Sequence, residues 1–162
     1  MYKMNTNKGF TLIELLIVVA IISMTMGIGL PSFQSIIAST RLTSATNAMV
    51  SALQSARFEA IKQHNVVIVR RTNSDWQNGW FLFVDLSGNT TQEVATEPTL
   101  TTFDSISSTI TIKSTYTNYV SYDGSGRANT GGHFTFCSGT DYRSVIIAAT
   151  GRIRTTTITS CI

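Results

Sequence analysis

The chain has 162 residues, enough for one compact domain beyond a long helix but too few to favour a second hydrophobic core. Twelve basic and nine acidic side chains give a net charge of +3, and two of the basic ones, Lys3 and Lys8, fall in the first nine residues. The charge balance therefore does not by itself indicate a nucleic-acid-binding protein. Any argument for such a role has to rest on local clusters of charge.

An apolar run of residues 10–30 is interrupted by one charged side chain, Glu14. At 1.5 Å per residue, roughly 20 helical residues span the ~30 Å hydrocarbon layer of a membrane. Lys3 and Lys8 precede the run, which places the N-terminus on the cytoplasmic side and the rest of the chain outside. We expect a transmembrane helix over residues 10–31. Because a lone ionisable group in such a segment is costly, we also expect a functional role for Glu14.

The residues around Glu14 also carry a processing signal. The small residue suited to cleavage, Gly9, precedes the apolar run, whereas an ordinary secretory signal is cleaved after it. The segment of residues 8–14, KGFTLIE, resembles the type IV prepilin processing motif. The resemblance implies that a prepilin peptidase removes a leader of residues 1–9, that the new N-terminus at Phe10 is methylated, and that Glu14 acts in filament assembly.

Processing would give Glu14 a physical partner. The new amino group of Phe10 is cationic, and in a helical filament it can approach the Glu14 carboxylate of a neighbouring subunit. Because an unpaired buried charge is unfavourable, removing one partner of such a pair costs about 3 to 5 kcal/mol. The alternative is that Glu14 belongs to an ordinary membrane anchor and extends its carboxylate toward the membrane surface.

The helix is expected to continue through residues 32–64 as an amphipathic stem. Apolar side chains recur there at spacings of three and four, which indicates one face that packs against a globular head. They are Leu42, Ala45, Met49, Ala52, Leu53, Ala56, Ala60 and Ile61. Before the stem, Gly27, Gly29 and Pro31 predict a kink or local melting, since proline removes a donor and clashes with the preceding turn. The resemblance to pilins implies that the helix unwinds in this region when the filament assembles. The alternative is a fixed kink.

From residue 65 onward the pattern changes to short runs rich in β-branched and aromatic residues, several of them separated by glycine-containing turns. The runs cover residues 66–71, 79–84, 106–113, 118–122, 133–137, 143–149 and 152–158. We expect residues 65–162 to form a head of antiparallel β structure, arranged as two small sheets packed on the helix. The fold class is therefore α+β.

The chain has two cysteines, Cys137 and Cys161, both in the region expected outside the cytoplasm. An oxidising compartment would let them pair, and closing a loop of that length contributes about 3 to 4 kcal/mol in the chain-entropy model. The alternatives are two buried thiols or half of a metal site. His64 and His133 are the available histidine partners, and their spacing does not fit a zinc site, so we expect no metal.

Three further segments narrow the resemblance to one family. Residues 76–85 (WQNGWFLFVD), 122–127 (YDGSGR) and 149–154 (ATGRIR) resemble blocks found in minor pilins of the FimT/GspH family. With the processing motif, the resemblance covers nearly the whole chain. It implies the type IV pilin fold and assembly with other pilins. It also implies residence in the bacterial inner membrane as a prepilin with its head in the periplasm, and later a place in the pilus at the cell surface.

The Gly151-Arg152-Ile153-Arg154 segment is the candidate for chemistry beyond assembly. In an extended strand, Arg152 and Arg154 lie on one face about 6 to 7 Å apart and could bridge two adjacent phosphates. The planar guanidinium donates two hydrogen bonds to a phosphate, and Gly151 permits a positive φ and close approach. FimT-like pilins with a Gly-Arg-x-Arg motif are implicated in binding double-stranded DNA during natural transformation, and both arginines match.

Other basic residues, Arg143, Lys113 and Arg127, are candidates to extend this DNA-binding surface. The alternative for each is a solvated surface charge. For Arg152 and Arg154 the alternative is a charged strand edge that discourages aggregation.

We find no P-loop, no His-Glu-x-x-His and no Gly-x-Ser-x-Gly segment, so we expect neither an enzyme nor a cofactor. The sequence predicts a minor type IV pilin that binds extracellular duplex DNA, without sequence specificity, for uptake. The alternative is a purely structural minor pilin, or a GspH-like pseudopilin of type II secretion, that primes or caps a filament without binding DNA.

Overall fold

The computed structural model describes residues 9–161, without the side chains of residues 27–32. The predicted leader, apart from Gly9, and the side chains at the predicted helix interruption therefore lie outside the described residues. The chain divides into two compact units, Met1–Ile37 and Ala38–Ile162.

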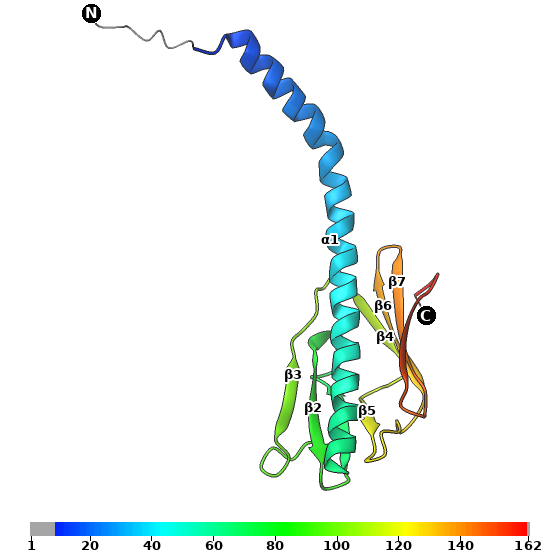
Figure 1. The fold of residues 1–162 in the computed structure, drawn as a ribbon. Coiled ribbons are helices and arrows are strands. Elements are labelled where there is room, and N and C mark those ends of the chain that lie inside the picture. The colour runs from blue at the N-terminus through cyan, green and yellow to red at the C-terminus, as the bar shows by residue number, and fades with distance from the viewer. Residues whose placement is uncertain (1–8, 162) are drawn as a thin grey trace, which may run out of the picture. The chain divides into compact units, whose positions relative to one another are not determined.

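One α-helix, α1 (Leu12–Gln63), begins in the first unit and ends in the second (Figure 1). It continues through Gly27, Gly29 and Pro31, so the local melting expected there is absent from this structure. The physical reason is that a proline removes one donor from the helical ladder, while the other turns of a 52-residue helix keep theirs.

The first turn of α1 is closed by a reciprocal cap. The Glu14 carboxylate accepts hydrogen bonds from the N–H and the hydroxyl of Thr11, both at 2.9 Å, and the Glu14 N–H donates to Thr11 Oγ1 at 3.3 Å. This capping box satisfies donors that the helix itself leaves unpaired. Glu14 is thus held in place within its own chain.

The apolar side chains that flank Glu14 are exposed; that of Phe10, for example, is 91% exposed. Among the residues that the structure describes, no helix combines the length and the apolar character needed to cross a membrane. The predicted span over residues 10–31 includes side chains at 27–31 that lie outside the described residues.

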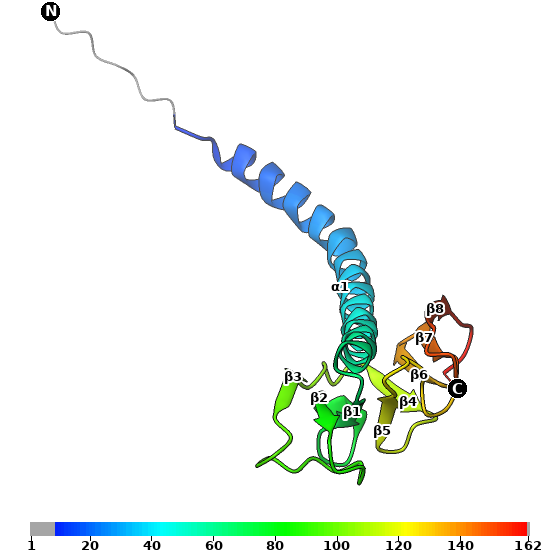
Figure 2. The same cartoon turned by 60° about the horizontal axis from the view of Figure 1, so that its bottom comes forward.

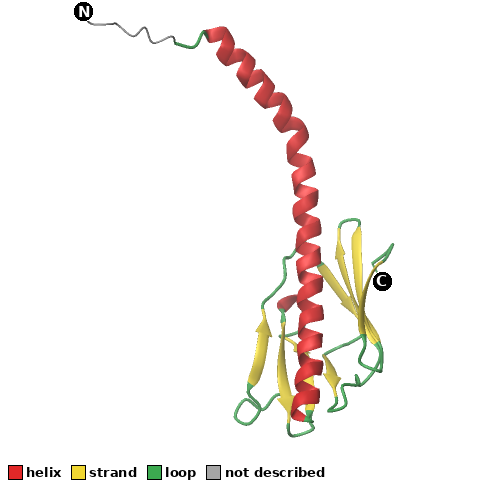
Figure 3. Cartoon of the chain, viewed as in Figure 1, coloured by secondary structure: helices red, strands yellow, loops and turns green. Residues whose placement is uncertain are grey.

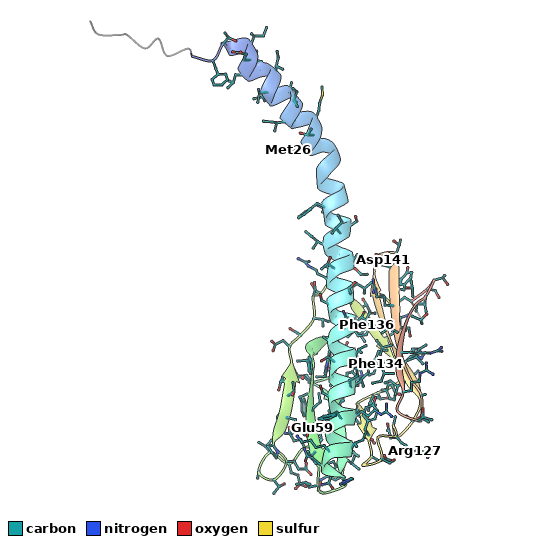
Figure 4. The ribbon with its side chains drawn as sticks, viewed as in Figure 1. Met26, Glu59, Arg127, Phe134, Phe136 and Asp141 are labelled. Carbon is teal, nitrogen blue, oxygen red and sulfur yellow. A yellow bond between two sulfur atoms is a disulfide. The ribbon has the colours of Figure 1, made fainter. Side chains whose placement is uncertain are left out.

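The stem of α1 buries the predicted apolar stripe, with one exception. The buried members are Leu42, Ala45, Met49, Ala52, Leu53, Ala56 and Ala60. Ile61 is 43% exposed, because it faces the loop around Gly126 and not the core. The core side chains Phe134 and Phe136 of the second sheet lie beneath α1 (Figure 4), and Phe134 meets Trp76 edge-on with ring centroids 4.8 Å apart.

Two four-stranded antiparallel sheets pack against the stem, as the sequence predicted. The first has the order β3-β2-β1-β5 and consists of β1 (Val66–Arg71), β2 (Trp80–Asp85), β3 (Thr99–Phe103) and β5 (Tyr119–Tyr122). The second has the order β4-β6-β7-β8 and consists of β4 (Thr111–Ser114), β6 (Gly132–Ser138), β7 (Asp141–Ile147) and β8 (Ile153–Thr157). A short 3₁₀ helix, η1 (Trp76–Asn78), precedes β2. The sheets lie side by side with α1 across their junction (Figures 2 and 3).

The predicted strands differ from the structure most at two places, while the other strands agree to within one or two residues at their ends. Strand β3 was missed because its sequence, TLTTF, has an exposed, threonine-rich pattern without apolar alternation. The strand predicted over residues 106–113 begins later, at Thr111, because a turn closes where the Ile110 N–H donates to the Ser107 carbonyl at 3.0 Å. Both errors lie in edge strands, where burial requires the least regular alternation of apolar and polar residues.

The loop between β2 and β3 is held by a buried carboxylate, Glu97. Its oxygens accept the backbone N–H groups of Glu93 at 2.9 Å, Ser87 at 2.9 Å and Leu86 at 2.7 Å. These hydrogen bonds, that of Glu93 first, lower the pKa of Glu97 below its ordinary value of 4.5.

We expect Glu97→Gln to lower the urea midpoint at pH 7 and to weaken its dependence on acid. A carboxylate whose pKa is lower in the folded state stabilises the fold above its ordinary pKa and loses this contribution as the pH falls through the lowered value. As the pH falls below the ordinary value of 4.5 and through the lowered pKa of Glu97, the wild-type midpoint should therefore fall more steeply than that of the variant. Asp104→Asn, at an exposed carboxylate, serves as the control. Parallel pH curves for wild type and Glu97→Gln would contradict the assignment.

Candidate nucleic-acid interface

The Gly151 segment forms the loop of a tight hairpin between β7 and β8. The Gly151 N–H donates to the Ala148 carbonyl at 2.8 Å, and the Ala148 N–H donates to the Arg152 carbonyl at 2.9 Å. Five residues, 148–152, lie between the strands, and Gly151 has a φ of +81°, a left-handed conformation that favours glycine. The glycine predicted to shape this turn does so.

A second loop, between β5 and β6, is folded around Asp123. One oxygen of Asp123 accepts hydrogen bonds from the Ser125 hydroxyl at 2.6 Å, the Ser125 N–H at 2.9 Å and the Arg127 N–H at 3.0 Å. The hydrogen bond from the Ser125 side chain is the largest cause of a lowered pKa at Asp123, followed by that of the Arg127 backbone. The carboxylate is therefore committed to shaping the loop.

The two loops contact each other beneath the last turns of α1. The Ala128 N–H donates to the Ala149 carbonyl at 3.2 Å, and Arg57 Nε, from α1, donates to the Gly126 carbonyl at 2.9 Å. A Cβ atom on Gly151 would overlap that same carbonyl oxygen. Two segments far apart in the sequence, residues 122–127 and 149–154, therefore form one packed unit.

Arg57 is a residue that sequence reasoning missed. It sits half-buried between Leu53, Ala56 and Ala60, which are core positions of the stem. The sequence offered one indication of its role, because Arg57 is a charged residue next to the apolar stripe of the helix. Its carbonyl partner, Gly126, could not be read from sequence because the contact spans 69 residues.

Arg152 and Arg154 lie exposed on one face of the second sheet. Arg154 pairs with Ile146 across β7 and β8, while Ile153 points the other way and packs against the core. Both arginines line a hollow of about 280 Å³ together with Ile146 and Ala148. The prediction that the two side chains share a face is confirmed.

The three extension candidates fall in different places. Arg127 follows Gly126 directly, on the loop that packs against the Gly151 hairpin, and it lies at the opposite end of the head from Asp141 (Figure 4). Lys113 lies on β4, the far edge of the same sheet, where its Nζ donates to the Cys161 carbonyl at 3.1 Å. Arg143 shares a face of β7 with the buried Val145, whereas Arg154 pairs with Ile146, which points to the other face, so Arg143 lies on the opposite face from Arg154. The structure therefore places Arg127 on the loop beside the Gly151 hairpin, outside the lining of the hollow at the arginine pair, and places Arg143 on the other face of the sheet.

Cys137 and Cys161 form a disulfide, as predicted. The bond ties the C-terminal segment that follows β8 back to β6, two strands away in the sheet. Both cysteines are thereby consumed, which removes the buried-thiol and metal-site alternatives. Thr135 and Ser144, on the outer face of the sheet, are buried, whereas Arg152 and Arg154 lie on the part of this face that stays open.

Comparison with known proteins now defines the class. Residues 45–151 match the family "Type II transport protein GspH", and residues 4–30 match the "Prokaryotic N-terminal methylation motif". A type IV minor pilin of Pseudomonas aeruginosa, FimU, has the same fold, with a TM-score of 0.63 and 24% identity over 76% of this chain and 97% of that one. A long N-terminal helix on antiparallel sheets is thus the type IV pilin fold.

Sequence relatives support the same class through part of their length. A "Fimbrial protein" of Pseudomonas aeruginosa is 43% identical over 74 residues, which are 46% of this chain and 47% of the relative. A "Type IV major alpha-pilin" of Moraxella bovis is 46% identical over 59 residues, or 35% and 37%. The chain thus spans about half or less of the length of these relatives. Since the GspH match covers most of the chain, the protein belongs to the GspH family of minor pilins and pseudopilins.

We expect Gly151→Ala to lower the free energy of unfolding by about 3 kcal/mol, because the left-handed conformation and the overlap with the Gly126 carbonyl both penalise a side chain. Gly139→Ala is the matched control: Gly139 also has a positive φ, of +58°, but faces open space, so we expect a loss of about 1 kcal/mol. Chemical denaturation measures both. Equal losses in the two variants would show that the close approach to Gly126 carries no energetic weight.

Proposed function

We propose that this minor pilin binds double-stranded DNA through Arg152 and Arg154 after it has been incorporated into a filament, and that the DNA is bound for uptake. The observation that carries the proposal is the exposed pair of guanidinium groups on one face, beside an open hollow. The Gly151 hairpin supports it, since a rigid turn holds the start of β8 before any ligand arrives. Preorganised donors lose less conformational entropy on binding.

The chemistry of the site suits a phosphate backbone. Arginine donates paired hydrogen bonds to phosphate and stays charged at every working pH. Such contacts carry no base information, so we expect binding without sequence specificity. Because few phosphates are neutralised, a single subunit should bind weakly and with a strong dependence on salt. Several subunits in one filament would raise the overall affinity.

Assembly is proposed to depend on Glu14. Cleavage by prepilin peptidase after Gly9 would free the amino group of Phe10, and after its methylation this cationic group can pair with the Glu14 carboxylate of a neighbouring pilin. The exposed apolar side chains near Phe10 suit the inner membrane before assembly and a filament core afterwards. The capping box means that Glu14 starts from a fixed geometry in the subunit.

The DNA-binding proposal predicts that Arg152→Gln combined with Arg154→Gln abolishes binding. The full chain, kept in solution by a non-ionic detergent, is titrated into labelled duplexes of unrelated sequence. If each arginine contributes about 1.5 kcal/mol, the loss exceeds about 100-fold. We expect all duplexes to behave alike.

The matched control removes two charges elsewhere, with Arg41→Gln on α1 and Arg143→Gln on the opposite face of the sheet. We expect a loss of less than about threefold from the general reduction in positive field. If the folded Arg152/Arg154 variant binds as tightly as wild type, the proposal is wrong. The subunit is then best described as a structural pilin that primes or caps its filament.

For assembly, we expect Glu14→Ala to be processed but to enter filaments poorly, because the amino group of Phe10 loses its partner. Glu14→Gln separates two roles, since glutamine preserves the capping box but not the charge. The amount of each variant in sheared filaments provides the measurement. Normal incorporation of Glu14→Gln would assign the residue to helix capping and not to an ion pair.

A further inference from the structure

We propose that Arg57 of α1 and Arg152 form a second phosphate-binding site, which extends the DNA path from the face of the sheet onto the helix stem. This inference rests on the proposed function and adds a residue that lies outside the Gly151-Arg152-Ile153-Arg154 segment. The ligand is a phosphate group of the DNA backbone.

The site is a hollow of about 340 Å³ between the last turns of α1 and the start of β8. Its lining consists of Gln54, Arg57, Phe58, Ile61, Arg152 and Ile153. Arg152 also lines the hollow that it shares with Arg154, so the two hollows adjoin at this residue. Arg57, Arg152 and Arg154 therefore form a continuous row of cations.

The side chain of Arg57 is oriented before any ligand binds. Its Nε donates to the Gly126 carbonyl at 2.9 Å, which fixes the plane of the guanidinium. Among the described residues, its two terminal nitrogens donate to no protein acceptor. A guanidinium held at one edge and open at the other is suited to donate two parallel hydrogen bonds to a phosphate.

Two carboxylates near Arg57 in the chain or in the loop that it contacts, Glu59 of α1 and Asp123 of the Gly126 loop, are engaged elsewhere. Glu59 forms an ion pair with Lys62 at 3.1 Å and accepts a hydrogen bond from Gln63 at 2.8 Å. Asp123 is occupied by the amide and hydroxyl groups of its own loop. Within residues 9–161, neither Arg57 nor Arg152 forms an ion pair with a carboxylate, so an anion is the complementary occupant of the hollow.

The dependence of DNA affinity on salt tests this site. Each phosphate contact contributes a slope of about −0.9 to a plot of log affinity against log salt, so three arginines predict a steeper line than two. For the full chain in non-ionic detergent with a 20-base-pair duplex, Arg57→Met should lower the magnitude of the slope by about 0.9 and the affinity about tenfold. Arg57→Lys should keep the slope and lose at most about threefold, since it keeps the charge.

Arg41→Met is the matched control, because it removes one exposed arginine from the same helix about four turns before Arg57. We expect its slope to equal that of wild type. If Arg57→Met and Arg57→Lys lose affinity equally, Arg57 only supports the Gly126 loop and the inference is wrong. It is also wrong if neither variant differs from wild type while the Arg152/Arg154 variant loses binding, an outcome that leaves the proposed function standing.

A measurement without DNA separates the two proposals. Pyrophosphate is titrated into the ¹⁵N-labelled chain while the Nε–H resonance of Arg57 is followed. A saturable shift that Arg152→Gln weakens supports the site even if the wild-type chain fails to bind duplexes, which would remove the proposed function alone. An unchanged resonance at saturating pyrophosphate overturns the site.

Discussion

The head depends on one apolar stripe of α1 that two sheets share. Each four-stranded sheet has one face to bury, and neither is large enough to close a core by itself. Small residues of the stripe, Ala52, Ala56 and Ala60, are fully buried and let the strands approach the helix closely. The loops around Gly126 and Gly151 pack against the end of this stripe, which holds them in place. The candidate interface is built from these two loops.

The sequence was most informative where burial of one face imposes a regular spacing of apolar residues. The stem stripe, six of the strands and the pairing of Cys137 with Cys161 follow from apolar spacing and from the compartment. It was least informative at the threonine-rich edge strand β3, where either face tolerates polar side chains. At Pro31 a local rule predicted melting, but the rest of a long helix outweighs the loss of one donor.

The same contrast holds at the interface. Alternation along β8 was enough to predict that Arg152 and Arg154 share a face, because that property is local. The contact of Arg57 with Gly126 was not predictable, since it joins a helix to a loop 69 residues away. Gly151 predicted that another group comes close to the backbone at this position, but the sequence did not indicate which group. The structure identifies the carbonyl of Gly126.

The disulfide would have a mechanical consequence if the subunit binds DNA as proposed. Strand β8 lies at the edge of its sheet, so a pulling force on Arg152 or Arg154 acts on backbone hydrogen bonds to β7 alone. Such a strand would unzip from a loose end, one pair at a time. Here the Gly151 hairpin bounds one end of β8, and beyond the other end the Cys137–Cys161 bond ties the C-terminal segment to β6, so covalent bonds set the limit of peeling.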